Sequence, residues 1–584
     1  MKKIINKPET VVVEMCNGLV LAYPELEFLP RYKIIKKKVI NKNKVSLISG
    51  GGSGHEPAHA GYVGKGMLDA AICGDVFASP SQIQVYQGIR ETASDKGTLL
   101  IIKNYSGDIM NFTNAAEMAK EEGINVDYIK VEDDIAVKDS LYTVGRRGVA
   151  GTVLVHKVAG AAAEEGLDLQ AVKEIGQHAA NNVRTIGFAL DSCVVPASGV
   201  PTFEISDGEM EYGVGIHGEP GKSREKAMNA DELANRMVNE LVRDLNVSKG
   251  DEVTLLVNGF GGTPLQEIYL FNNAVYKVLD SMGIKVYRCF AGNFMTSIDM
   301  LGASVTIMKM DDLLKKYLDM PSYAPGFPVK GPVESVAYKP VTTADATTVP
   351  DKVSFNNEWK KVSGNAITLD NITAMVYRMM ECIIENEVHF CKLDSYAGDG
   401  DFGASIAKGF LQVKREWDDI LEKDHSTIKE FLIRCSLVIM EYCGGASGPI
   451  WGSAFRAAGI KAGNVTEMSL KEFADMMQAT VKGIQVTGER SFGRGAVVGD
   501  KTLIDALVPC ADTLSQCASQ NELIKDALHK GAEAAVKGAE STKDIVARMG
   551  RAGVVGERSL GYPDAGAYAL GVIFTDVANF LIYE

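Results

Sequence analysis

The chain has 584 residues, of which 46% are apolar and 23% charged, a balance typical of a globular protein with about two to four domains. Its formal net charge of −14 excludes a broadly cationic surface for nucleic acid or anionic lipid. No apolar run reaches the ~20 residues of a membrane span, and the ten cysteines form no C-x-x-C pair, which predicts reduced thiols in a cytoplasmic protein.

Short apolar or β-branched runs that end in Gly or Asn recur through the first half of the chain. The clearest are Val45–Ser49, Leu99–Lys103, Arg184–Leu190 and Glu252–Val257. Each precedes a helical pattern, and the repeated order of strand, glycine turn and helix is typical of an α/β domain. In such sheets ligands bind beyond the carboxyl ends of the strands. We therefore expect an α/β domain over residues 1–320 with its site at the glycine turns.

The first of these turns contains a formal H-E-x-x-H match from His55 to His59, within Ser49–His59. That motif binds zinc only when both histidines project from one face of a helix. Four glycines just before His55 and Pro57 between the histidines exclude such a helix, because proline is tolerated only in a first turn. What remains is a strand, a glycine loop and a helix N-terminus that could approach a polar ligand. A tight structural turn is the alternative.

Two further turns in this half carry chemically useful side chains. Lys103 and Asp108 follow a predicted strand and face the same crevice if the α/β prediction holds. Asp108 could act as a general base, or it could be a solvated helix cap. His217 lies between glycines in the loop Gly213–Gly221. It is either an ordinary surface residue or a neutral nucleophile toward a carbonyl carbon.

Six prolines fall between residues 321 and 350, in a stretch with little hydrophobic periodicity. Such a segment is extended and cannot build a core of its own. We predict an interdomain linker over residues 321–358, with a long surface loop inside one domain as the alternative.

The last part of the chain has the spacing of amphipathic helices. Apolar residues recur at helical intervals from Ile372 to Ile383, with Asp370 as a candidate N-cap. Ile428–Met440 and Leu470–Val486 follow the same spacing. Residues 359–584 are therefore predicted to form an all-helical domain.

Three carboxylates, those of Asp394, Asp399 and Asp401, lie within eight residues of the helical half. Like charges this close repel strongly unless a cation neutralises them. Hard oxygen ligands select Mg²⁺, Mn²⁺ or Ca²⁺. An EF-hand is excluded, because Gly403 and Phe410 occupy its later acidic positions. The pattern favours Mg²⁺ shared with nucleotide phosphates, with a solvated acidic turn as the alternative.

Two small-residue turns follow the acidic motif. Gly444–Gly452 could bind phosphate through backbone donors. Gly495–Thr502 misses the Walker A pattern by one residue of spacing and by the Asp before Lys501. Because no strand is expected before it, we reject a P-loop, so that any nucleotide site depends on metal-bound phosphates.

Taken in order, these motifs resemble the single-chain, ATP-dependent dihydroxyacetone (glycerone) kinase family over nearly the whole chain. The family's K domain is matched by Gly50–Gly64, Lys103–Phe112, Gly215–Glu219 and Asn258–Thr263. Its L domain is matched by Gly398–Asp401, Gly444–Gly448 and Gly499–Asp505. The resemblance implies an α/β K domain followed by an all-α helical-barrel L domain.

The resemblance also implies how the K domain acts. His217 would attack the ketone of the substrate and hold it as a covalent hemiaminal, a bond that glycerol cannot form. His55 and Asp108 would bind the hydroxyls of the substrate, with Asp108 as the base. Lys103 and the backbone of Gly52, Ser53 and Gly54 would help to position it.

For the L domain, the resemblance implies that Asp394, Asp399 and Asp401 hold two Mg²⁺ ions bridging the phosphates of ATP. It implies a homodimer in which the K domain of one chain faces the L domain of the other. The nucleotide pocket is assigned to Asp399, Gly400, Asp401, Phe402, Ala446, Ser447, Thr502, Leu503, Asp564, Ala565 and Gly566.

Three positions depart from the family pattern and leave the exact sugar open. Ala565 replaces a proline beside the nucleotide, Arg494 replaces a glycine, and Phe402 replaces a smaller or more polar residue. A four-carbon ketose such as erythrulose therefore competes with dihydroxyacetone as the substrate.

The other hypotheses for the function are FMN-forming cleavage of FAD at the same metal site and a non-catalytic ketose sensor. A kinase with a phosphoprotein donor is disfavoured by the fused chain.

Overall fold

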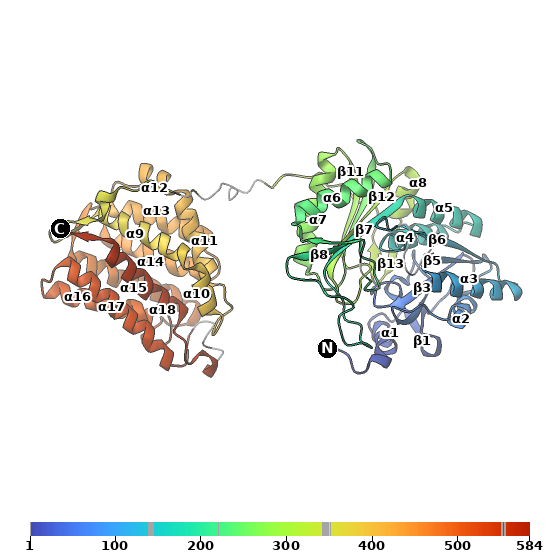
Figure 1. Cartoon of the computed structure of the whole chain (residues 1–584), viewed down its shortest axis with the longest axis horizontal. Helices are drawn as coiled ribbons and strands as arrows, with labels where there is room; N and C mark the ends of the chain where they lie inside the picture. Colours follow the sequence, from blue (N-terminus) through green and yellow to red (C-terminus); the bar gives the residue numbers. More distant parts are fainter. Residues whose placement is uncertain are drawn as a thin grey trace. The chain divides into compact units, whose positions relative to one another are not determined.

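The computed structural model describes residues 2–137, 145–219, 221–341, 350, 352–549, 553 and 556–584. The chain divides into two compact units, Met1–Val341 and Thr342–Glu584 (Figure 1). The first is α/β and the second is helical, as the sequence predicts. Within the described ranges no helix has the length and apolar character needed to cross a membrane.

The first sheet of the α/β unit has six strands. Four adjacent strands, β4, β3, β5 and β6, run parallel to one another. Side chains alternate across it: Leu99 and Ile101 pack on one face, while Leu100 and Ile102 pack on the other. In sheet order the strands are β1 (Leu26–Leu29), β2 (Ile34–Lys37), β4 (Ala70–Val76), β3 (Ser46–Ser53), β5 (Thr98–Lys103) and β6 (Val126–Val131).

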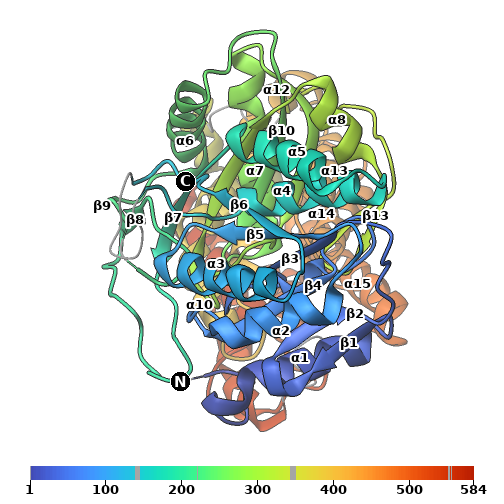
Figure 2. The same cartoon turned by 90° about the vertical axis from the view of Figure 1, so that its right-hand side faces the viewer.

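Helices cover both faces of this sheet, so its strands are apolar on both sides. The helices α2 (Gln82–Thr92) and α3 (Ser106–Glu121) pack together over one face. The helices α4 (Gly151–Glu164) and α5 (Leu169–Asn181) pack against its other face, and Figure 2 turns this unit toward the viewer. The N-terminal helix α1 (Val11–Ala22) contacts β1 and β4.

The second sheet is mixed and is joined to the first by α4. Every residue from Gly151 to Ala163 of that helix is buried, and the helix contacts β3 and β6 of the first sheet and β7 and β12 of the second. In sheet order its strands are β11 (Lys285–Gly292), β10 (Glu252–Gly259), β12 (Leu301–Lys309), β7 (Val183–Asp191), β8 (Glu209–Tyr212) and β9 (Ser223–Lys226). The remaining helices are α6 (Ala230–Asp244), α7 (Leu265–Ser281) and α8 (Asp312–Asp319).

The four strands predicted from the sequence all form, as β3, β5, β7 and β10. The helix predicted after the first glycine loop is wrong, because only a 3-10 turn forms, over Ala60–Tyr62. The carbonyls at the start of the expected helix bind another segment of the chain instead. Gly54 O accepts from the N–H of Ile298 at 2.8 Å, and His55 O accepts from the N–H of Thr296 at 3.2 Å.

The predicted linker is too long at its N-terminal end. Strands β13 (Ser322–Ala324) and β14 (Phe327–Val329) form a hairpin, and its Ala324, Phe327 and Val329 side chains are buried in the core of the α/β unit. The N–H of Gly326, at the turn, donates to Gly61 O at 2.7 Å. Proline therefore marks a tight hairpin here rather than a solvated connection. Residues 342–349 and 351 of the predicted linker lie outside the described residues.

The helical unit is a closed ring of helices. Neighbours in the chain pack together from α13 to α18, α18 packs on α9, and α11 packs on both α9 and α13, which closes the ring. The helices are α9 (Leu369–Glu385), α10 (Glu387–Asp394), α11 (Phe402–Arg415), α12 (Trp417–Lys423), α13 (Ile428–Tyr442), α14 (Ser447–Ala462), α15 (Leu470–Phe492), α16 (Ile504–Ser519), α17 (Ile524–Ser541) and α18 (Ala565–Phe580).

The first helix of this ring is capped two residues earlier than predicted. The side chain of Thr368 accepts from the N–H of Asn371 at 3.2 Å, and the side chain of Asn371 accepts from the N–H of Thr368 at 3.0 Å. This reciprocal pair satisfies two free N–H groups of α9. Asp370, the predicted cap, lies inside the first turn instead, where its charge favours the helix dipole.

Candidate functional site

The glycine loop at the end of β3 lies directly against two charged side chains. A Cβ atom on Gly51 would lie 2.6 Å from Lys103 Nζ and 3.3 Å from Asp108 Oδ2. A Cβ on Gly54 would lie 2.9 Å from the ring of Phe77. Both glycines have positive φ, +150° and +105°. The loop therefore needs glycine for its conformation and for its close approach to these side chains.

Lys103 and Asp108 form a buried ion pair. Lys103 ends β5 and Asp108 lies in the first turn of α3, and Nζ donates to Oδ2 at 3.0 Å. The other carboxylate oxygen of Asp108 accepts from the hydroxyl of Ser79. Their exposed fractions are 0% for Lys103 and 2% for Asp108, so Asp108 is not a solvated cap.

His55 is buried beside this pair and its tautomer follows from its partner. Its Nδ1 lies 2.9 Å from the carbonyl oxygen of Thr296. A carbonyl only accepts, so Nδ1 carries the proton and Nε2 is bare. That Nε2 has no hydrogen-bond partner among the described residues. Burial, with the nearby His217 and Lys103, holds the pKa of His55 well below its usual value.

The end of β10 fixes the segment that orients His55. The side-chain oxygen of Asn258 accepts from the N–H of Phe294 at 2.8 Å and of Met295 at 2.9 Å. Its side-chain nitrogen donates to Met295 O at 2.8 Å. Asn258 therefore holds the backbone next to Thr296, which gives a physical role to the Asn-Gly-Phe-Gly-Gly-Thr motif.

His217 lies beside His55 in the same group of side chains. The His217 ring lies 4.8 Å from that of His55, 4.4 Å from Tyr105 and 5.6 Å from Phe77, measured between centroids. The His217 side chain is only partly exposed, so it is not an ordinary surface residue. Burial, with the positive charges of Lys103 and Arg147, holds the pKa of His217 well below its usual value. The imidazole is therefore neutral at neutral pH and keeps a free lone pair.

A buried ion-pair network fastens the loop that carries His217. The N–H of His217 donates to Glu219 at 2.8 Å, and Glu219 accepts from Arg147 at 3.1 Å. Arg147 also donates to Asp134 and to the carbonyl of Gly213, at 2.7 and 2.8 Å. Pro220 of this loop lies outside the described residues.

Several residues that build this pocket escaped the sequence analysis. Ser79, Arg147 and Thr296 come from segments without a chemical motif, so no local signal identifies them. Tyr105 and Glu219 stand inside the motifs already described, and only the fold shows that one contacts His217 and the other holds its backbone.

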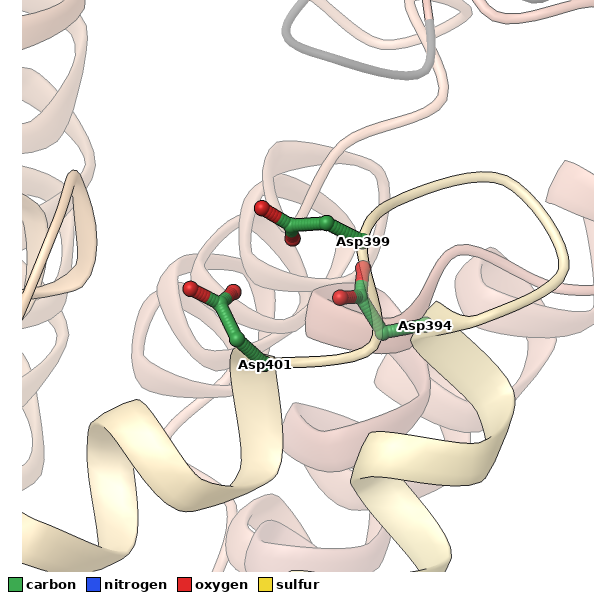
Figure 3. A group of neighbouring side chains, drawn as sticks. All are labelled: Asp394, Asp399 and Asp401. Atoms are coloured by element: carbon green, nitrogen blue, oxygen red, sulfur yellow. The ribbon is translucent and has the colours of Figure 1, made fainter. Parts of the chain in front are cut away.

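The helical unit brings the three predicted acidic residues together on the connection between α10 and α11 (Figure 3). One oxygen from each of Asp394, Asp399 and Asp401 lies within 4.8 Å of the others. Asp399 and Asp401 are exposed and Asp394 is partly buried. The N–H of Gly400 donates to Asp394 at 2.9 Å, which folds the loop around that carboxylate. Clustered, accessible carboxylate oxygens suit a hard divalent cation such as Mg²⁺.

The predicted nucleotide residues lie at helix N-termini of the same unit. Ala446 and Ser447 begin α14, while Thr502 and Leu503 precede α16. Asp564 caps α18 and accepts from the N–H of Ala567 at 2.8 Å. Helix N-termini present free N–H groups to anions, so these ends could bind phosphate.

The pKa of Asp564 is raised by its burial and by neighbouring acidic residues. Burial, together with repulsion from Asp505 and Asp394, raises the pKa of Asp564 to about 7. Ala565 and Gly566 form the buried first turn of α18.

Lys501 cannot act as a Walker lysine. Its ammonium donates to the carbonyl oxygens of Ile545 at 3.2 Å, Ser559 at 2.5 Å and Tyr562 at 2.8 Å. An ammonium has three N–H donors, and all three are used.

Two of the positions that depart from the family pattern have clear partners in the structure. Phe402 begins α11, and its ring centroid lies 6.3 Å from that of Phe390. Arg494 forms an ion pair with Asp500 at 2.5 Å.

Comparisons with known proteins cover both units. The Dak1 domain model matches residues 17–326 and the DAK2 domain model matches residues 396–579. The dihydroxyacetone-binding subunit DhaK of the PTS-dependent dihydroxyacetone kinase 1 of Listeria innocua is 48% identical over 343 residues, 58% of this chain and 100% of its own. Two relatives match along both units. They are a triokinase/FMN cyclase of Rattus norvegicus, 34% identical over 99% of each chain, and an L-erythrulose 1-kinase of Mycolicibacterium smegmatis, 32% identical over 100% of each.

A solved structure also matches both units. The dihydroxyacetone kinase of C. freundii in complex with AMP-PNP and Mg²⁺ superposes with a TM-score of 0.58 at 30% identity, covering 99% of each chain.

Proposed function

The chain belongs to the dihydroxyacetone kinase family, and we propose that it transfers a phosphoryl group from ATP to a terminal hydroxyl of a short-chain ketose. The observation that carries the proposal is the pocket of the α/β unit. There a neutral imidazole, His217, meets the bare Nε2 of His55 beside the buried Lys103–Asp108 pair. Such a pocket combines a nucleophile, a hydrogen-bond acceptor and a base.

His217 acts as the nucleophile that captures the ketose. Its lone pair adds to the carbonyl carbon and the C=O π bond breaks. The carbonyl oxygen takes up a proton and the imidazole gives up its own N–H proton, so that a neutral hemiaminal forms with no net gain or loss of atoms. Glycerol has no carbonyl carbon and cannot form this bond. Discrimination thus depends on chemistry, since a hydrophobic pocket alone separates similar small molecules by only about 1–3 kcal/mol.

Asp108 acts as the base toward the hydroxyl that receives phosphate. Ser79 and Lys103 each donate to one of its oxygens, and this orients the carboxylate. His55 accepts a hydrogen bond from a second hydroxyl through its bare Nε2. The backbone of Gly52, Ser53 and Gly54 completes the wall of the pocket.

The helical unit supplies the phosphoryl donor. Asp394, Asp399 and Asp401 hold Mg²⁺, two ions in this proposal, and the helix N-termini at Ser447 and Thr502 face the nucleotide. When bound, Mg²⁺ neutralises the negative charge of the ATP phosphates. The C. freundii kinase with AMP-PNP and Mg²⁺, which matches this chain over 99% of its length, supports this assignment.

The test measures ADP release by the purified protein with Mg-ATP and a panel of dihydroxyacetone, D-erythrulose, L-erythrulose and glycerol. We expect ADP release with the ketoses and none above background with glycerol. The ratio of kcat/KM values assigns the three- or four-carbon substrate. Release that does not depend on a ketose contradicts the proposal.

A second activity, cleavage of FAD to a cyclic FMN, is favoured by one observation. The acidic cluster and the nucleotide turns lie in one unit, while His217 lies in the other. The relatives named triokinase/FMN cyclase match along the full length of the chain. The His217→Ala variant separates the two activities, because only ketose phosphorylation needs that side chain.

We also propose a homodimer in which the K domain of one chain works with the L domain of the other. The chain offers a direct test through two inactive variants, His217→Ala and Asp401→Asn. Co-expressed, they restore up to about one quarter of the wild-type activity if each site is shared between two chains, because half of the dimers are mixed and each has one intact site. No restoration, in mixed dimers verified by differential tags, contradicts sharing.

The ten cysteines support a reducing compartment. All are free thiols and eight of them are buried. Disulfide-free, buried thiols are typical of cytoplasmic proteins, and we propose that location for the kinase. Fractionation of cells that carry a tagged chain tests it.

A further inference from the structure

Lys103 has more donors than the described residues satisfy. Its side chain is fully buried and its ammonium has three N–H groups. Among the described residues, Asp108 is its one hydrogen-bond acceptor, at 3.0 Å, and the Tyr105 ring lies 5.2 Å from Nζ. A buried charge is stable only when its donors find acceptors. Two N–H groups of Lys103 are left for a substrate oxygen and for one further acceptor.

A pair of buried histidines carries two further ring nitrogens that have no partner among the described residues, and one of these two nitrogens is an acceptor. Nδ1 of His59 lies 3.0 Å from Nε2 of His156, with the ring centroids 5.2 Å apart. The outer nitrogens, Nε2 of His59 and Nδ1 of His156, are buried and have no hydrogen-bond partner in the described part of the chain. The side chains are 5% and 0% exposed. Neither histidine has a place in the mechanism described so far.

The two histidines lie on segments that both approach Lys103. His59 follows His55 on the glycine loop, which touches the Lys103 ammonium at Gly51. His156 stands on α4, and the segment that leads into α4 crosses β5, since a Cβ on Gly148 would lie 2.8 Å from the Cα of Lys103. Burial, followed by the positive charge of Lys103, holds the pKa of His59 well below its usual value and that of His156 at about 3.

Both imidazoles are therefore neutral, and the pair shares one proton between His59 Nδ1 and His156 Nε2. If His59 donates that proton, its outer Nε2 is bare and accepts; if His156 donates it, Nε2 of His59 carries a proton and donates. A nearby ammonium favours the first arrangement, because it attracts a lone pair and repels an N–H. In this arrangement His59 Nε2 is a bare acceptor, and the contact of Nδ1 with His156 fixes the ring.

We propose that His59, fixed by His156, is a positioning residue that holds the Lys103 ammonium through one buried water, so that the remaining N–H of Lys103 points at the ketose. The role rests on the proposed ketose site. A single water accepts from Lys103 and donates to His59 Nε2, which satisfies both surplus groups. The three N–H groups of Lys103 then have Asp108, this water and the substrate as partners.

The two nitrogens of each ring can be tested separately. The side-chain amide of Asn reaches about as far as Nδ1 of His, and that of Gln about as far as Nε2. At position 59 the nitrogen that the proposal assigns to the Lys103 water is Nε2, which lacks a partner within the described ranges, so His59→Gln keeps a polar group there and His59→Asn removes it. At position 156 the nitrogen toward His59 is Nε2, so His156→Gln keeps the pair and His156→Asn breaks it.

We expect His59→Asn and His156→Asn each to raise the KM for the ketose about 10-fold, the effect of one lost hydrogen bond to a charged group. Both Gln variants should stay within about 3-fold of wild type, and the KM for ATP should not change. The double Asn variant should be no worse than His59→Asn alone, because both act through one group. The matched control is His425→Asn in the helical unit, which breaks the 2.7 Å contact of His425 with Thr373 and should leave the ketose KM unchanged.

The inference is overturned if Asn and Gln behave alike at each position, or if the KM values for ketose and ATP rise together, since both outcomes indicate a purely structural pair. Thermal melts identify a variant that does not fold, and the other three variants then decide. If the wild-type protein releases no ketose-dependent ADP, the proposed function fails rather than this inference.

Discussion

The two sites of this chain differ in how complete they are without a ligand. In the α/β unit, Lys103, Asp108 and His55 are buried, and each is tied by hydrogen bonds to another residue. In the helical unit, Asp399 and Asp401 are exposed beside one another. Polar groups can be buried only with partners, whereas like charges remain in water until a cation neutralises them. Folding alone therefore assembles the buried side chains of the proposed ketose site, while the acidic residues of the proposed donor site stay in contact with water.

The variant expected to separate the activities of the two units most strongly is His217→Ala. It removes the proposed nucleophile, so ketose phosphorylation should fall by at least about 1,000-fold. Cleavage of FAD, which uses the helical unit, should be unchanged. The matched control is His178→Ala, an exposed histidine paired with Asp311 at 2.5 Å, which should leave both rates alone. Ketose phosphorylation above a tenth of the wild-type rate refutes the role of His217.

Asp108→Asn should separate capture from transfer within the α/β unit. The amide cannot accept a proton, so kcat should fall by about 100-fold or more, while the ketose adduct on His217 should still form. Rapid-quench kinetics and intact mass measure the two steps. Asp127→Asn, which breaks a half-exposed pair with Lys173, is the control and should change neither. A loss of adduct with kcat unchanged would reverse the assignment.

Asp401→Asn should affect only the helical unit. The Mg²⁺ concentration required for nucleotide binding should rise by at least about 10-fold, since even indirect changes at metal sites cost that much. Calorimetry should show ketose binding unchanged. Asp419→Asn, an acidic residue of α12 paired with Lys423, serves as the control. An unchanged Mg²⁺ requirement would argue that the acidic cluster is only a solvated turn.

The α/β pocket should also resist acid. Burial and nearby positive charges hold the pKa values of His55 and His217 well below the ordinary value of 6.5. Ketose affinity should therefore change by less than about 2-fold between pH 7.5 and 5.5, where a histidine with an ordinary pKa would lose about tenfold. Titration calorimetry at the two pH values measures this, and a tenfold loss contradicts it.

The same histidines fix the sign of one stability effect. In the unfolded chain they take up protons below about pH 6.5, while in the folded pocket they do not. The free energy of unfolding of the α/β unit should therefore fall as pH falls below that value.

The smallest expected effect is on the stability of helix α9 in the helical unit. Thr368→Ala removes the N-cap of α9 and should cost about 1 kcal/mol, seen as faster amide exchange in the first turn of that helix. Asp370→Ala should have a smaller effect, because its carboxylate only favours the helix dipole. If Asp370→Ala has the larger effect, the sequence-based cap was the right one.

Local sequence patterns were enough to predict both unit types, four strands and three helices of the second unit, because apolar spacing and glycine turns are local signals. They also identified His55, Lys103, Asp108 and His217 as candidate site residues. They could not supply Thr296 or Arg147, whose partners lie 241 and 72 residues away in the chain. Tertiary contacts also decided the failures. The helix expected after the glycine loop is replaced by hydrogen bonds to residues 296–298, and the start of the expected linker is a buried hairpin.

The most direct test of the account follows the substrate carbon itself. Dihydroxyacetone labelled with carbon-13 at its carbonyl is added to the full-length protein without ATP, and its NMR signal is recorded. We predict that the bound signal leaves the ketone range for that of a tetrahedral carbon, and that it stays in the ketone range with His217→Ala. A bound ketone signal in wild-type protein that still phosphorylates the sugar would contradict the covalent capture on which this account depends.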